Sequence, residues 1–153
     1  MPSSRSLEDL FADRPDLTGT AVAEIAFPGE LRERLIAAYL DGTKTAGSSL
    51  LLEYEIADEP LPVPGDRSIM VDSQRRPVAL LTVSAVDVVP MDEVDLRIAV
   101  GEGEGFASVD QWRAAHMEFW TSDDFRDEIG DPAFTPADDA PVVVEWVELG
   151  ETF

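Results

Sequence analysis

The spacing of apolar residues predicts two helices and an extended run in the first third of the chain. Apolar residues recur every three or four positions from Leu7, behind a cap at Ser6, until Pro15 ends the pattern, since proline cannot continue a helix. Segment 28–42 repeats the helical spacing, with a proline near its start and a glycine at its end, an asymmetry typical of helices. Between them, residues 20–27 form a short strand-like run.

The pattern changes in the middle of the chain. Residues 60–66 contain three prolines and a glycine, so they predict a connector. Segments 67–72 and 77–89 are rich in β-branched residues and are separated by a polar turn, which predicts paired strands. Segment 108–130 opens with a serine–glutamine capping box and continues at helical spacing, and 141–149 is a final apolar strand. These segregated elements favour an α+β fold, a small mixed β-barrel flanked by helices.

Composition limits the protein class. A length of 153 residues fits one domain, and 44% apolar content is typical of globular proteins. Cysteine is absent, so neither disulfides nor thiolate chemistry are available. No window approaches the ~18–20 unbroken apolar residues of a membrane span, and the first residues lack the apolar core of a signal peptide. We therefore expect a soluble cytoplasmic protein.

The formal net charge is −21 and is unevenly distributed. Residues 1–50 carry a net charge of −3, whereas residues 51–153 carry −18. Such a surface opposes broad electrostatic attraction to nucleic-acid phosphates or anionic lipid. Solubility alone would account for an acidic surface, and a local anion pocket remains compatible with it.

Lys44 is the only lysine, and ten arginines supply the remaining positive charge. Arginine cannot lose its proton in a protein, whereas a partly buried lysine amine loses its proton readily. Lys44 follows the predicted helix end and is either an ordinary solvated charge or a functional amine.

Three motifs in order along the chain are similar to the ASCH domain family. They are G-x-K at Gly42–Lys44, E-G-E-G at Glu102–Gly105, and W-R-x-A-H at Trp112–His116. The resemblance implies a PUA-like β-barrel over residues 27–149, preceded at 1–26 by an N-terminal helix and extended segment.

The resemblance also implies a cleft, lined by the G-x-K loop, for RNA or modified nucleosides. Some bacterial members remove the acetyl group from N4-acetylcytidine with a lysine, a threonine three positions later and a glutamate, and another branch cleaves RNA. Here the lysine corresponds to Lys44, and Glu102 and Glu104 are the candidate glutamates. Position 47 is glycine, which can neither attack a carbonyl nor relay a proton. Ser48 is a substitute hydroxyl, because on an extended segment it would share a face with Lys44.

Further residues are expected to line this cleft. Trp112 and His116 lie one helical turn apart, so they form either part of the core or a wall for stacking a nucleobase. Glu102 and Glu104 could hold a divalent cation, but no histidine or aspartate cluster completes a ligand set in the sequence. We therefore expect no metal and no cofactor. The predicted ligand-binding residues are Gly42, Thr45, Ser49, Tyr54, Trp112 and His116.

Two hypotheses for the function stay open from the sequence. In one, the chain is a non-catalytic module that binds a nucleoside or short RNA segment. In the other, the same cleft hydrolyses an amide on a modified nucleoside, and an RNA-cleaving activity is a further alternative. The net charge favours a small ligand over long RNA, and neither DNA nor a membrane is expected as a partner. The sequence does not indicate an oligomeric state.

Overall fold

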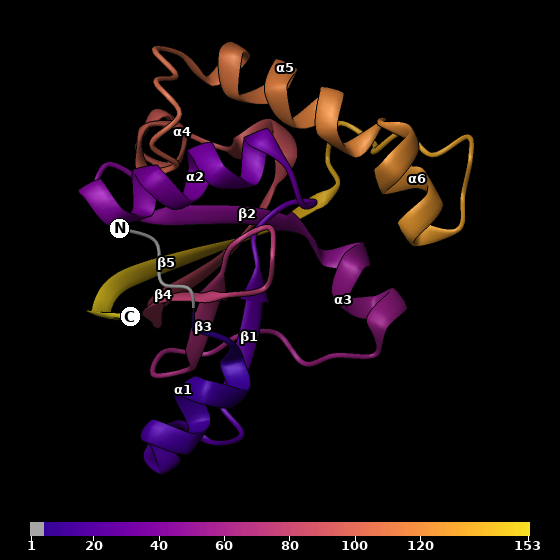
Figure 1. Ribbon diagram of the computed structural model, residues 1–153. Coiled ribbons are helices and arrows are strands. Elements are labelled where there is room, and N and C mark those ends of the chain that lie inside the picture. Colours follow the sequence, from indigo (N-terminus) through magenta and orange to yellow (C-terminus); the bar gives the residue numbers. More distant parts are fainter. Residues whose placement is uncertain (1–4) are drawn as a thin grey trace.

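The computed structural model describes residues 5–153, and its centre is a mixed five-stranded sheet curled into a half-barrel (Figure 1). The strand order is β1-β3-β4-β5-β2, with β1 parallel to β3 and every other neighbouring pair antiparallel. This arrangement confirms the predicted α+β class with a mixed, barrel-like sheet. The strands are β1 (Ala21–Glu24), β2 (Ala46–Leu50), β3 (Arg67–Val71), β4 (Pro77–Pro90) and β5 (Pro141–Thr152).

Six α-helices surround the sheet in the described part of the chain. In Figure 1, α5 and α6 lie together beyond one end of the sheet, and α1 lies at the opposite end. None of the helices within residues 5–153 is both long and apolar enough to cross a membrane. The helices are α1 (Leu7–Asp13), α2 (Glu30–Asp41), α3 (Leu51–Ala57), α4 (Leu96–Gly101), α5 (Val109–Trp120) and α6 (Asp123–Ile129), with 3₁₀ turns η1 (Pro15–Leu17) and η2 (Met91–Glu93).

Strand alternation gives the sheet two buried faces, because successive side chains point to opposite sides. On β3, Ile69 packs against α1, while its neighbour Met70 packs against α2. On β5, Val144 joins the cluster formed with α4, α5 and α6, whereas Val147 joins the α2 cluster around Tyr39. The functional residues described below lie where the α2 cluster meets the cluster under α5.

Two predicted helix ends are confirmed. Ser6 and Asp9 form a capping box at the start of α1, which satisfies backbone donors that a helix leaves unpaired. Gly42 follows α2 with φ of +84°, a left-handed conformation that glycine adopts without steric cost. The helix expected from residue 28 begins at Glu30. The division of the chain at residue 27 stays a prediction.

The prediction of a single helix over 108–130 was wrong. The structure has two helices there. α5 ends at Trp120, and the Ser122 side chain accepts a hydrogen bond from Phe125 N to start α6. A serine that caps a new helix competes with continuation of the old one. Sequence analysis also missed the short helices α3 and α4, which contain too few turns to show a clear period.

Candidate functional site

The loop between α2 and β2 carries Lys44 into the interior. Lys44 N donates to Ala38 O at 3.0 Å, which turns the chain back over the end of α2. Thr45 N donates to Gly101 O at 2.7 Å and ties the loop to the end of α4. The Lys44 residue is consequently only 5% exposed. The lone lysine is therefore not an ordinary surface charge.

The Lys44 amine is held by main-chain oxygens and an aromatic ring. Nζ donates to Ala46 O at 2.9 Å and to Glu102 O at 3.2 Å, and lies 5.2 Å from the centre of the Tyr39 ring. Within residues 5–153, no carboxylate lies close enough to Nζ to form an ion pair. Burial lowers the pKa of Lys44, and the negative charges of Glu102 and Glu104 oppose this effect. The buried Lys44 amine therefore loses its proton more readily than the amine of a surface lysine.

Glu102 lies at the end of α4 and is 2% exposed. Its Oε2 accepts the indole proton of Trp112 and lies 3.0 Å from His116 Nε2. Burial raises the pKa of Glu102, but the hydrogen bond and charge of His116, the charge of Lys44 and the Trp112 bond together hold the pKa below its ordinary value. Trp112 itself is fully buried, with the His116 ring stacked 4.2 Å from it.

The hydrogen-bond partners of His116 define its protons. Nδ1 lies 2.8 Å from Trp112 O, and because a carbonyl can only accept, Nδ1 carries a proton. Nε2 faces the Glu102 carboxyl, so a second proton lies between these two groups, on one or the other. A hydrogen bond therefore joins Glu102 and His116, and Trp112 contacts both.

Glu104 lies between this buried group and solvent. Its side chain is 17% exposed and 3.9 Å from the Arg34 guanidinium. Burial raises the pKa of Glu104, the charge of Lys44 lowers it and that of Glu102 raises it, so the net shift is upward. Glu104 therefore holds its proton to a higher pH than an exposed glutamate.

The structure gathers three groups that could hold a metal ion. Glu102, Glu104 and His116 each offer one ligand atom, and these atoms all lie within 4.8 Å of one another. Sequence analysis missed this grouping because His116 is 12 or more positions from both glutamates along the chain. A cation here would have to replace the hydrogen bond between Glu102 and His116. The expected absence of a metal stays a prediction.

Gly103 explains how the two motif loops pack together. Its φ is +69°, and a Cβ on it would lie 2.6 Å from Lys44 N and 2.7 Å from Lys44 Cα. Only glycine permits this approach between the E-G-E-G and G-x-K backbones. The close contact keeps Glu102 O within reach of the Lys44 amine.

A cavity of about 300 Å³ opens beside the packed loops. Thr43 of the G-x-K motif, Gly103 and Glu104 line it, with Arg34 and Asp41 from α2. Arg34 lies ten positions before Lys44 in the sequence. The fold brings it to the same opening as Glu104.

The hydroxyl residues of β2 lie on two faces. Ser48 Oγ is buried without a hydrogen-bond partner in residues 5–153, and strand alternation places Ser48 with Ala46 and Leu50. No hydrogen bond joins Ser48 to Lys44 in the described chain. Thr45 Oγ1 lies 3.4 Å from Gly101 O. Sequence analysis expected Ser48 to share a face with Lys44 if the segment is extended. β2 begins at Ala46, and the shared face stays a prediction.

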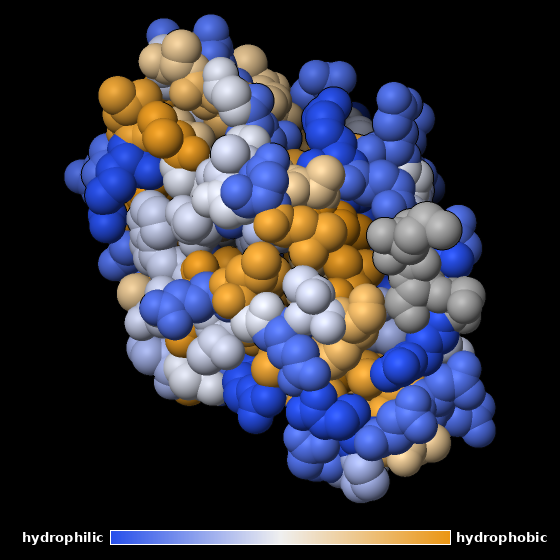
Figure 2. All heavy atoms as spheres, turned by 60° about the vertical axis from the view of Figure 1, so that its left-hand side comes forward, coloured by the Kyte–Doolittle hydropathy of each residue, from blue (hydrophilic) through white to orange (hydrophobic). Residues whose placement is uncertain are grey.

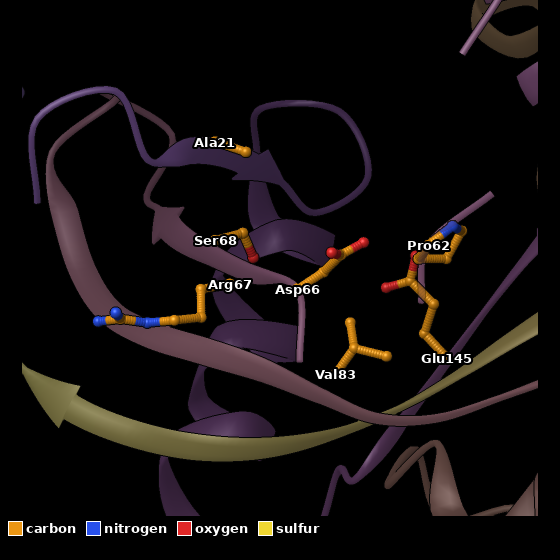
Figure 3. A pocket seen from close by; sticks show the side chains of 7 residues that line it. All are labelled: Ala21, Pro62, Asp66, Arg67, Ser68, Val83 and Glu145. Carbon is orange, nitrogen blue, oxygen red and sulfur yellow. The ribbon is translucent and has the colours of Figure 1, made fainter. Parts of the chain in front are cut away.

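Ser49 and Tyr54 belong to a separate polar region. Tyr54 Oη donates to Glu145 Oε1 at 3.1 Å, and Ser49 is also a hydrogen-bond partner of Tyr54. Glu145 lines a second cavity of about 370 Å³ with Asp66, and Figure 3 shows Arg67 extending away from these two carboxylates. Burial raises the pKa of Glu145, the Tyr54 hydrogen bond lowers it and the charge of Asp66 raises it.

The surface and the composition together bear on whether long RNA could bind. Figure 2 shows one face on which hydrophobic residues occupy the centre and hydrophilic residues surround them. The chain has 32 acidic residues against 11 lysines and arginines. A continuous basic track of the kind that long RNA requires is therefore difficult to form.

Comparisons with known proteins agree with the motifs. The ASCH domain family model matches residues 23–149. The fold is similar to a crystal structure of a protein from Enterococcus faecalis, with TM-score 0.75 and 26% identity over 95% of this chain and 86% of that one. It is also similar to an ASCH domain from Lactobacillus crispatus, with TM-score 0.73 and 20% identity over 97% and 98%. No curated protein matches the chain.

Proposed function

Because the chain belongs to the ASCH domain family, we propose that it binds a nucleoside-sized ligand beside Lys44 and hydrolyses an amide on it. The substrate class is an N4-acylated cytidine. The observation that carries the proposal is the buried Lys44 amine, whose pKa is lowered by burial and which has no carboxylate within ion-pairing distance in residues 5–153. The neutral form of such an amine can accept a proton from water.

The residues around the amine suit the remaining proton transfers. Water attacks the carbonyl carbon of the amide while its proton passes to Lys44 Nζ. The bond between the carbonyl carbon and nitrogen then breaks, and Glu104 gives a proton to the departing nitrogen. The raised pKa of Glu104 keeps part of this carboxyl protonated, as a general acid requires. The products are a carboxylic acid and the free amino group.

Glu102 has a positioning role in this scheme. Its carboxyl is occupied by Trp112 and His116, and its main-chain oxygen accepts from Lys44 Nζ at 3.2 Å. Trp112 and His116 thus fix the loop that holds the amine. Because Trp112 is fully buried against His116, we give it this supporting role and assign the nucleobase to the cavity beside Glu104.

The size and charge of the site favour a small ligand. The cavity of about 300 Å³ is at the lower end of small-molecule sites. Arg34 is available at its opening to contact an anionic group. A nucleoside or nucleotide needs no extended basic surface, which suits a chain of net charge −21.

One observation favours the second candidate function, a binding module without turnover. Lys44 Nζ already donates hydrogen bonds to two main-chain oxygens. These bonds would also stabilise a charged ammonium. In that case its remaining proton would contact a carbonyl or phosphate of the ligand. The RNA-cleaving alternative lacks the basic surface that a polymer substrate needs.

Chromatography of N4-acetylcytidine incubated with the protein tests the proposal. We expect cytidine to appear, and Glu104→Gln to slow its release by ~10²-fold or more because the proton donor is lost. Glu93→Gln is the matched control, because Glu93 is exposed on η2 and lies outside both motifs. Calorimetric binding of N4-acetylcytidine without product would instead establish the binding module. Neither product nor binding would reject both functions.

A further inference from the structure

A tyrosine hydroxyl lies in the space that the side chain of residue 47 would otherwise enter. Gly47 is on β2, and a Cβ built on it would lie 3.2 Å from Tyr39 Oη. Tyr39 comes from the last turn of α2, so sequence distance gives no indication of this contact. The absence of a side chain at position 47 and the position of the phenol are therefore two aspects of one packing arrangement.

The Tyr39 hydroxyl lacks a hydrogen-bond partner among the described residues. The residue is 5% exposed, yet Oη forms no hydrogen bond with any residue in the 5–153 range. A hydroxyl without a protein partner in such a site costs free energy unless water or a ligand bonds to it. Tyr39 is thus a polar group whose hydrogen-bonding capacity the fold leaves unused.

Tyr39 is also close to the proposed base. Lys44 Nζ lies 5.2 Å from the centre of the Tyr39 ring. Burial raises the pKa of Tyr39, and the charges of Glu145, Glu102 and Glu104 raise it further. The phenol consequently keeps its proton at neutral pH, and a neutral O–H can donate to a negatively charged oxygen.

Resting on the proposed hydrolysis, we infer that Tyr39 is a catalytic residue that supplies the hydroxyl absent from position 47. Its O–H donates a hydrogen bond to the carbonyl oxygen of the amide as water adds and that oxygen becomes negative. The Tyr39 proton stays on the phenol throughout, so the proton transfers between water, Lys44, Glu104 and the departing nitrogen are unchanged. Stabilising the oxyanion is a step that a preorganised donor accelerates strongly.

The inference has a rescue test, because the hydroxyl can be moved from α2 to β2. Tyr39→Phe removes Oη and should lower kcat for N4-acetylcytidine by ~10²-fold or more, the usual effect of deleting one oxyanion donor. Adding Gly47→Thr to Tyr39→Phe returns a hydroxyl to the vacated space and should recover at least ~10-fold of that loss. The matched control is Tyr39→Phe with Gly47→Val, because valine has nearly the shape of threonine without the hydroxyl.

Each outcome separates this inference from the proposed function. Loss in Tyr39→Phe with recovery by threonine and not by valine supports the role of Tyr39, provided thermal melting shows all variants folded. Wild-type turnover that Tyr39→Phe leaves within twofold would overturn the role of Tyr39 and leave the proposed function intact. Turnover only in variants with threonine at position 47 would show that Tyr39 is no substitute. Absence of turnover in every variant would reject both ideas.

Discussion

Replacing Lys44 by arginine tests whether the buried amine acts as a base. Arginine keeps the positive charge but cannot lose its proton, so the proton transfer from water should fail. Loss of a general base lowers kcat by ~10²- to 10⁴-fold, which corresponds to about 3–5 kcal/mol of transition-state stabilisation. A residue that served only as a surface charge would tolerate this exchange.

The surroundings of Lys44 also predict an effect on stability. The residue is 5% exposed and its amine fits between Ala46 O and Glu102 O. A guanidinium is larger and must displace these neighbours, and such overpacking costs about 1–3 kcal/mol. The variant should therefore unfold at a lower temperature, by about 2–4 °C per kcal/mol for a chain of this size.

The pH dependence of the rate supplies an independent readout. The scheme requires a neutral Lys44 and a protonated Glu104, so the wild-type rate should rise with pH below the lower of their two pKa values and fall above the higher one. Burial lowers the pKa of Lys44 from 10.5 and raises that of Glu104 from 4.5. Folding stability should also rise with pH between the lowered pKa of Lys44 and 10.5, because the unfolded chain binds the proton more tightly there. Lys44→Met, which has no titrating amine, should lose this increase in stability.

The assay compares kcat for N4-acetylcytidine across pH 6 to 10, with the product measured by chromatography. Urea unfolding reports whether each variant is folded. Arg75→Lys is the control exchange between the same residue types, because Arg75 is exposed and pairs only with Glu24 among the described residues. Lys44→Arg with kcat within twofold of wild type would refute the base role.

Three further predictions concern the support of the site and its partners. Glu102→Gln should destabilise the fold by about 1–3 kcal/mol at pH 7. Because the Glu102 pKa is lowered in the folded state, this difference in stability should shrink as the pH falls below 4.5. A difference in urea unfolding that stays constant with pH would contradict this prediction. Gly103→Ala should lower the melting temperature far more than Gly105→Ala, since both have positive φ but only the Gly103 Cβ would meet the Lys44 backbone, and equal shifts would argue against close packing of the loops. Generic single-stranded RNA should bind no tighter than ~10⁻⁴ M at physiological salt, and micromolar affinity with a steep salt dependence in fluorescence anisotropy would revive the RNA-cleaving alternative.

Local chemistry in the sequence determined several elements without help from the fold. The Ser6 cap, the glycine after α2 and the β-branched runs of β3 and β4 each act on their own neighbours, so their effect is visible in a short window. Two local signals pointed to Lys44: it ends the G-x-K motif, and it is a single lysine among ten arginines. The same local reasoning failed where two short-range preferences compete, as at Ser122, where capping a new helix outweighed continuing the old one.

The tertiary structure decided which of the candidate residues meet. Glu102 and Glu104 are two positions apart, yet one is buried against Trp112 and His116 while the other borders a cavity. That difference depends on how α4 and α5 pack. Ser48 forms no hydrogen bond with Lys44 in the described chain, and β2 begins two residues after the lysine, a boundary that hydrogen bonding to β5 sets. Tyr39 entered the site only because α2 packs over the edge of the sheet at Gly47. Burial and pKa depend on distances between segments remote in sequence, and those distances exist only after the chain has folded.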